Sequence, residues 1–289
     1  MIDAIFYFVD FVKLLYKKAF HDDIFSRAAQ VAFYFSFSLF PLLFFLVSLF
    51  GLVLDSTVDL KSELYAYMRQ LMPLTAFDLV QKTVEEIIAN SSGGKLTLGI
   101  LIAVWSASAG MDSLRVALNS VYEVREKRSW LKTKGLSIGM TLALTILAAV
   151  VLGLVFYGWQ LVQIALGWIG FQITSPLVLV SVEWLAMLAI MLFACELIYN
   201  LMPSFPELDW KWITPGSFVA IALWLLLTTA FRLYLEYFNT YNKTYGSLGA
   251  VIILMLWLYL TALVILIGGA INSVLKELKR NEQAAEPTT

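Results

Sequence analysis

The chain has 289 residues, of which 60 % are hydrophobic and only 14 % are charged, and its mean hydropathy is +0.80. Soluble domains carry about 25 % charged residues, so this composition excludes an ordinary soluble protein and favours a polytopic integral membrane protein. The formal net charge of −1 argues against a chain that is basic throughout, as many nucleic-acid-binding proteins are. One cysteine and one histidine leave no intrachain disulfide, CxxC metal site, zinc-binding histidine cluster or Ser-His-Asp triad. We therefore expect no metal and no cofactor.

The first twenty residues predict an amphipathic helix that lies on the membrane surface. Asp3, Asp10, Lys13 and Lys17 recur at spacings of seven, three and four, which places them on one stripe of an otherwise apolar helix. Such a helix buries its apolar face at the level of the lipid headgroups.

An uncharged interval between Arg27 and Asp55 predicts the first transmembrane helix, over 28–54. A hydrocarbon core about 30 Å thick needs about 20 apolar residues at 1.5 Å per residue, so this interval is long enough. Pro41 lies in its middle and removes one backbone hydrogen bond. We therefore expect a kink near Ser36–Ser38.

Residues 55–95 predict an amphipathic helical hairpin outside the membrane. Apolar residues recur at helical spacing on both sides of Pro73. The neighbouring carboxylates Glu85 and Glu86 diverge by about 100° on a helix, so they indicate a solvated face rather than an acid–base pair.

Five further apolar intervals complete an all-α, polytopic fold with six transmembrane helices. The helix of the second span is expected to continue beyond the membrane through Asn119. The whole forms one predicted membrane domain, 1–275, followed by a short polar cytoplasmic tail, 276–289. The expected bounds of the five spans are 96–111, 136–159, 177–201, 213–231 and 246–275.

Two carboxylates fall inside the predicted fourth span. Glu183 lies near its start, and Glu196 lies deeper with Asn200 one turn beyond. An ionisable group in hydrocarbon is energetically costly, so each is expected to face protein or water and to find a partner.

The segment after the fifth span combines charged and aromatic residues. Arg232 and Glu236 are four residues apart, which predicts an ion pair on one helix face. Tyr241 and Tyr245 follow and are typical of an aromatic belt at headgroup level.

The distribution of Lys and Arg predicts the orientation in the membrane. With six spans, the amino terminus, 112–134, 202–212 and the tail share one side and hold 14 of these residues, while the other side holds 6. The positive-inside rule then places both termini in the cytoplasm and the hairpin outside. We interpret the dense basic run within 125–134 as a topology determinant in contact with anionic headgroups, rather than as a nucleic-acid site.

Several motifs occur in order along nearly the whole chain. They are Arg27-Ala28-Ala29-Gln30-Val31-Ala32-Phe33-Tyr34, Ser38-Leu39-Phe40-Pro41, Trp105-Ser106-Ala107-Ser108, Pro215-Gly216-Ser217, Tyr241, Tyr245-Gly246-Ser247-Leu248-Gly249 and Trp257-Leu258-Tyr259. Together they resemble the YihY/BrkB family of bacterial inner-membrane proteins. The resemblance implies six spans, cytoplasmic termini and no settled biochemical activity. Family members have been labelled ribonuclease BN, but one histidine, one cysteine and scattered carboxylates do not make a metal-dependent nuclease site.

The first functional hypothesis is translocation of a lipid or another amphiphile, with membrane lipids as partners. Transporters gather polar groups around a cavity, often beside broken helices. The candidate residues for such a path are Gln30, Pro41, Glu183, Glu196, Asn200, Arg232, Glu236, Tyr241 and Tyr245.

The alternative is an envelope scaffold that does not transport. It would assemble with itself or with an envelope protein through the hairpin and through small-residue pairs such as Gly246/Gly249 and Gly268/Gly269. An enzyme is disfavoured because no nucleophile and base can be paired from these residues.

Overall fold

The computed structural model describes residues 2–21, 23–55, 93–168, 176–207, 210–237 and 247–285. These residues form helices and their connections, without strands. The predicted outer hairpin, apart from its ends, and Tyr241 and Tyr245 lie outside the described residues. The helices are α1 (Ile2–His21), α2 (Ile24–Asp55), α5 (Gly93–Val121), α6 (Trp130–Trp168), α7 (Pro176–Leu201), α8 (Pro215–Tyr237) and α10 (Ser247–Ala285).

The chain divides into two compact units, Met1–Ser36 with Gly110–Thr289, and Phe37–Ala109. The smaller unit contains the second part of α2 and the first part of α5. Helix α2 remains helical across Pro41 and covers the whole predicted first span. The larger unit holds every polar cluster described below.

Five segments within the described residues are long and apolar enough to cross a membrane. They qualify by length and composition alone. The predicted first span, which lies within the long helix α2, is not among the five. Each segment overlaps one of the other predicted spans. The segments are Leu101–Val121, Trp130–Val155, Val180–Leu201, Pro215–Glu236 and Val251–Asn281.

Helices α6 and α10 extend furthest beyond the predicted spans, and α8 also runs to Tyr237 instead of 231. Helix α6 begins at Trp130 instead of near 136, because the N–H of Thr133 bonds to the Ser129 carbonyl (3.0 Å) and the ammonium of Lys134 is paired with a carboxylate. Helix α10 runs through Ala285, well into the predicted tail. Leu278 is buried there and α10 packs against α1, so burial supports the added turns.

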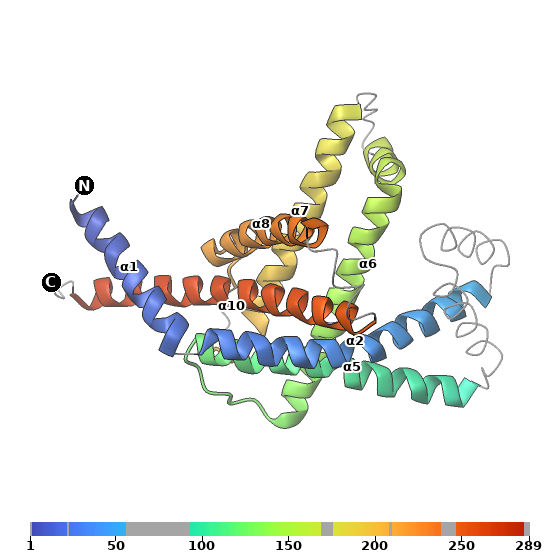
Figure 1. Ribbon diagram of the computed structural model, residues 1–289, viewed down its shortest axis with the longest axis horizontal. Helices are drawn as coiled ribbons and strands as arrows, with labels where there is room; N and C mark the ends of the chain where they lie inside the picture. Colours follow the sequence, from blue (N-terminus) through green and yellow to red (C-terminus); the bar gives the residue numbers. More distant parts are fainter. Residues whose placement is uncertain are drawn as a thin grey trace. The chain divides into compact units, whose positions relative to one another are not determined.

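Three helix pairings organise the larger unit: α8 packs along α10, α6 along α7, and α1 against α10 (Figure 1). Side chains such as Leu118, Tyr199 and Leu266 form its core. The α8–α10 crossing is close because Gly216 and Gly268 face each other, and a Cβ on Gly216 would collide with the backbone oxygen of Gly268.

Four separate basic segments meet at one end of the larger unit, which we call the basic end. Lys18 of α1 pairs with Glu123 in the α5–α6 connection (2.6 Å), although Lys18 is only 6 % exposed. The guanidinium of Arg128 bonds to carbonyls at the end of α7. The ammonium of Lys276 on α10 lies 4.8 Å from the ring centroid of Phe205. These are the four segments that the charge count assigns to one side of the membrane.

Candidate functional site

The carboxylate of Glu196 lies in the interior of the larger unit and is surrounded by hydrogen-bond donors. Glu196 is 1 % exposed. Its Oε1 accepts bonds from the Thr214 N–H (2.7 Å), the Thr214 hydroxyl (3.0 Å) and the Ser217 hydroxyl (2.6 Å). Its Oε2 accepts a bond from the Asn200 amide (3.2 Å). Among the described residues no cation pairs with it, so neutral donors and backbone compensate its burial.

The start of α8 explains why three of these donors converge. Thr214 is the N-cap residue, because the Ser217 N–H bonds to both its carbonyl (3.2 Å) and its hydroxyl (3.4 Å). Pro215 occupies the first helical position, where its missing N–H is not needed. The positive end of the α8 dipole therefore points at the Glu196 carboxylate, which it stabilises.

Two asparagines complete this group, which we call the Glu196 cluster: Glu196, Asn200, Thr214, Ser217 and Asn272. Asn272 of α10 accepts a bond from the Gly216 N–H (2.8 Å) and donates to the Thr214 hydroxyl (3.0 Å). Asn200 is also bonded through its amide to both the carbonyl and the N–H of Lys211 (3.0 Å each), which closes the α7–α8 connection. The cluster thus joins α7, α8 and α10.

Tyr122 extends the cluster toward the end of α5. Burial raises the pKa of its hydroxyl above the ordinary value, and a hydrogen bond with Asn272 opposes this rise. The hydroxyl therefore remains protonated at neutral pH.

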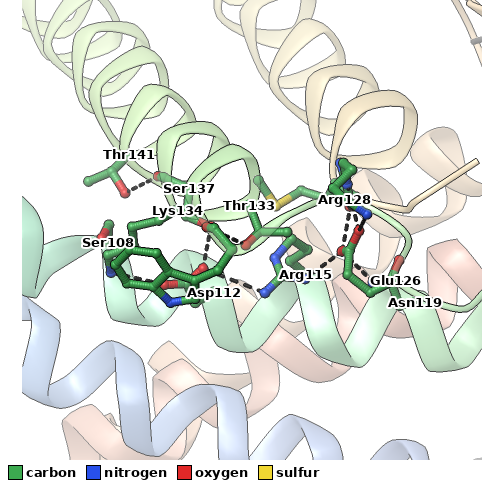
Figure 2. Close-up of polar contacts among 12 residues, drawn as sticks. Ser108, Asp112, Arg115, Asn119, Glu126, Arg128, Thr133, Lys134, Ser137 and Thr141 are labelled. Carbon is green, nitrogen blue, oxygen red and sulfur yellow. Dashed lines mark hydrogen bonds and ion pairs between the residues drawn. The ribbon is translucent and has the colours of Figure 1, made fainter.

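A second group of polar residues, which we call the Glu126 network, lies around the α5–α6 connection (Figure 2). Its centre is Glu126, which accepts bonds from Arg115, Asn119 and Arg128. A neighbouring part joins Asp112 to Lys134 (2.9 Å) and to the hydroxyl of Ser137 (2.6 Å). Burial by itself raises the pKa of Glu126, but the hydrogen bonds from Arg128, Asn119 and Arg115 outweigh it and lower the pKa well below its usual range.

Arg128 connects this network to the end of α7. Its guanidinium donates to the carbonyls of Leu201 (3.1 Å) and Met202 (2.7 Å), which are carbonyls that a helix end leaves without intrahelical partners. Asn119 binds the α7–α8 connection in a similar way, because its amide oxygen accepts a hydrogen bond from the N–H of Ser204 (2.8 Å). Both contacts hold the α7–α8 connection against α5 and α6.

A cavity of about 650 Å³ lies between these two groups. Three of its lining side chains are cationic, and none is acidic. Asn200 lines it too, so the cavity reaches the Glu196 cluster. The lining residues are Lys127, Arg128, Ser129, Lys132, Leu136, Asn200, Leu201, Pro203, Ser204, Phe205 and Pro206.

The structure brings together two of the site residues predicted from sequence, Glu196 and Asn200. Glu183 lies 13 residues earlier on α7, about 20 Å away along the helix axis. Its carboxyl group lies against Gly158 of α6, where a Cβ would collide with it.

The other predicted residues lie apart from this pair. Arg232 and Glu236 form the predicted ion pair (3.1 Å) near the opposite end of α8, beside a more apolar hollow of about 540 Å³ that Trp257 also lines. Gln30 is exposed on α2, and Pro41 is half-buried in the smaller unit.

Sequence reasoning missed Thr214 and Ser217 as partners of Glu196, and it missed Asn272, which bonds to Thr214 in the same cluster. The run Thr214-Pro215-Gly216-Ser217 is a recognisable helix start, with a capping threonine before proline. Asn272 is an amide in an otherwise apolar segment, which is a signal for an interhelical hydrogen bond. Neither signal identifies the partner, because that depends on how the helices cross.

The described residues contain no group of three His, Cys, Asp or Glu side chains that could hold a metal ion. Cys195 is a half-buried free thiol beside Glu196 in the sequence. The side chains at the site supply hydrogen bonding and charge, with cations at the cavity and a carboxylate behind it.

Long apolar helices, whose backbone polar groups are bonded within each helix, define a polytopic helical membrane protein. The chain belongs to the BrkB family, since the family model described as "Virulence factor BrkB" matches residues 15–289. It is 31 % identical to the ribonuclease-like protein YfkH of Bacillus subtilis, over 94 % of this chain and 97 % of that protein. It is 26 % identical to a UPF0761 membrane protein of Xanthomonas oryzae and 27 % identical to one of Chlorobium phaeobacteroides.

The match to those two UPF0761 proteins covers 96 % and 99 % of this chain but only 63 % and 61 % of theirs. No solved structure matches the chain.

Proposed function

We propose that the protein translocates a lipid or another amphiphile across the bacterial inner membrane, without catalysing a covalent reaction. The observation that carries this proposal is the continuity between the cavity and the Glu196 cluster. Asn200 lines the cavity and donates to the Glu196 carboxylate inside the helix bundle. A polar headgroup thus has hydrogen-bonding surface from the cavity toward the helix interior, while exposed apolar helix faces accommodate its chains.

The cavity lies at the depth where headgroups are found. Trp130 (64 % exposed) and Leu131 project at the start of α6, and Trp212 (74 % exposed) and Ile213 project just before α8. Tryptophan favours the interface between hydrocarbon and water, so these side chains mark that level at the basic end. On α1, the exposed apolar side chains of Val9, Val12, Tyr16 and Phe20 suit the same interface.

The orientation follows from charge. The basic end gathers the amino-terminal helix, both connections and the end of α10, and under the positive-inside rule it faces the cytoplasm. The cavity then opens toward the inner leaflet, and both termini are cytoplasmic.

The connection between α7 and α8, from Leu201 to Pro215, is the joint at which we expect the structure to move during transport. Transporters often bind their substrates where a helix is interrupted and a helix amino terminus points at a polar group. Here the start of α8 points at Glu196, and the contacts that hold the joint are hydrogen bonds rather than apolar packing alone. Exchange of those bonds for bonds to a headgroup offers a low-energy route into the bundle.

The scaffold alternative assigned Gly268 and Gly269 to contacts with another protein. Gly268 lies against Tyr199, Gly216 and Ala220, and Gly269 lies against Leu118, Tyr122 and Tyr199, so both glycines serve packing within the chain. YfkH carries the description ribonuclease-like, but the hydroxyls that bond to the Glu196 carboxylate, those of Thr214 and Ser217, are buried and so are not placed to attack a phosphodiester.

The test is lipid movement between leaflets in reconstituted vesicles. Purified full-length protein should increase the rate at which fluorescent phospholipid crosses the bilayer, with a proton gradient and a membrane potential applied in parallel samples. Glu196→Gln should reduce that rate, whereas Glu207→Gln, a change at an exposed carboxylate, should not. A wild-type rate equal to that of protein-free vesicles under all conditions refutes the proposal.

A further inference from the structure

The basic cavity has the composition of an anion site. Its lining includes Lys127, Arg128 and Lys132 and no carboxylate. Three cationic side chains around one hollow attract a negatively charged ligand, and the attraction is strongest where surrounding protein displaces water.

The three cations are not equally available. The guanidinium of Arg128 is held by Glu126 and by two carbonyls at the end of α7. Within the described residues, by contrast, the side chains of Lys127 and Lys132 have no acidic partner. Both are exposed, so both ammonium groups can turn toward a ligand in the cavity. Arg128 is thus paired with Glu126 and fixed in place, and the two lysines provide the charges that are available to a ligand.

The start of α6 adds to this positive potential. Ser129, whose carbonyl accepts the first helical hydrogen bond from Thr133, lines the cavity, and Lys132 lies in the first turn. Helix amino termini carry a partial positive charge and unpaired N–H groups, which suit phosphate oxygens. The helix start does not stand alone here, because the lysines and the cavity are independent features.

The volume of the cavity and its level in the membrane indicate which anion it can bind. About 650 Å³ is ample for a phosphate group with a small polar substituent. The exposed Trp130 and Leu131, directly after the lining residue Ser129, place the opening where lipid headgroups lie.

We infer that this cavity binds the phosphate group of a phosphomonoester or phosphodiester, with Lys127 and Lys132 as the residues that contact it. The inference deepens the proposed function and rests on it for the identification of the ligand as the transported headgroup. The binding site itself requires only the described side chains.

The experiment measures binding, not transport. Full-length protein in detergent is titrated with phosphatidylglycerol, with zwitterionic phosphatidylcholine and with inorganic phosphate, and bound ligand is counted by native mass spectrometry. The test variant is the double substitution Lys127→Gln and Lys132→Gln. The matched control is Lys13→Gln and Lys17→Gln, which removes the same charge from exposed positions of α1. Arg128 is left unchanged because it also holds the end of α7.

The expected result is that the wild type and the control bind phosphatidylglycerol more tightly than phosphatidylcholine, and that the test variant loses about tenfold in affinity for phosphatidylglycerol. Displacement of the lipid by millimolar inorganic phosphate supports the site and identifies free phosphate as a competent ligand. Lack of displacement supports the site and identifies the lipid headgroup as the source.

Two results overturn the inference: equal phosphatidylglycerol binding by the test variant and the wild type, or an equal loss in the α1 control. Because the assay involves no transport, its failure is distinct from that of the proposed function. Normal binding without lipid movement refutes translocation alone, whereas lipid movement with unchanged binding in the test variant refutes the phosphate site alone.

Discussion

The Glu196 carboxylate and the Thr214 backbone N–H lie 2.7 Å apart, so a residue near the end of one membrane helix caps the beginning of the next. The same oxygen also accepts the hydroxyls of Thr214 and Ser217. One side chain thereby bonds to three buried donors, of which the Thr214 N–H has Glu196 as its acceptor. Its removal should affect stability as well as any transport.

Replacement of Glu196 by leucine should lower the free energy of unfolding by about 3 kcal/mol, because it leaves the Thr214 N–H buried without an acceptor and removes the carboxylate that the Thr214 and Ser217 hydroxyls bond to. Glu196→Gln keeps one acceptor oxygen and should have a smaller effect. Thermal unfolding of the detergent-solubilised protein measures both. Glu183→Gln, far along the same helix, is the control and should change stability less than either. Equal melting temperatures for wild type and Glu196→Leu would contradict the structure.

Gly216→Ala should destabilise the protein by about 2 kcal/mol or more, since the added methyl group would meet the backbone of α10 at Gly268. Backbone atoms cannot turn aside as a flexible side chain can. Gly139→Ala on α6 is the matched control, because nothing lies within 4 Å of a Cβ there. We expect this control to leave stability unchanged or to raise it by up to about 1 kcal/mol, because alanine is the better helix former. Comparable losses for the two variants would show that the α8–α10 crossing is wrong.

The lowered pKa of Glu126 predicts how the stability of the protein changes with pH. Its pKa in the folded protein is lowered below the ordinary value of about 4.3, so the ionised carboxylate stabilises the fold. This contribution is complete at neutral pH and declines as the pH falls below about 5 toward the folded pKa. Melting temperatures of wild type and Glu126→Gln should therefore differ most near pH 7, and the difference should shrink steadily as the pH falls below about 5. A difference that grows on acidification would refute this role.

Single-cysteine variants in a Cys195→Ser background test the sidedness of the basic end. A membrane-impermeant maleimide should label Glu207→Cys and Arg280→Cys, both exposed, only from the cytoplasmic side. Glu236→Cys, at the far end of α8, should react from the outside. Intact spheroplasts and inverted vesicles provide the two directions of access. Labelling of all three positions from the same side would exclude the proposed orientation.

Much of the helical architecture was predictable because hydrocarbon imposes a simple requirement on sequence. Every backbone polar group must be satisfied within its own segment, so long uncharged intervals become helices. The apolar interval that contains Glu196 matches α7, and the uncharged interval before Lys276 matches α10. The helix ends were less predictable. Lys134 and Leu278 lie in helices because of a partner carboxylate and a packing neighbour, which a charge pattern does not contain.

The sequence by itself identified Glu196 and Asn200 as costly polar groups that need partners, and it identified 125–134 as a basic segment. Only the tertiary structure decided that Thr214 and Ser217 are the partners of Glu196, that Asn272 joins them through Thr214, and that Lys127 and Lys132 line one cavity with Asn200. The physical reason is that these interactions act over different distances along the chain. Burial in hydrocarbon acts on each helix separately and leaves a pattern along the chain, whereas hydrogen bonds and cavities depend on where helices distant in sequence cross.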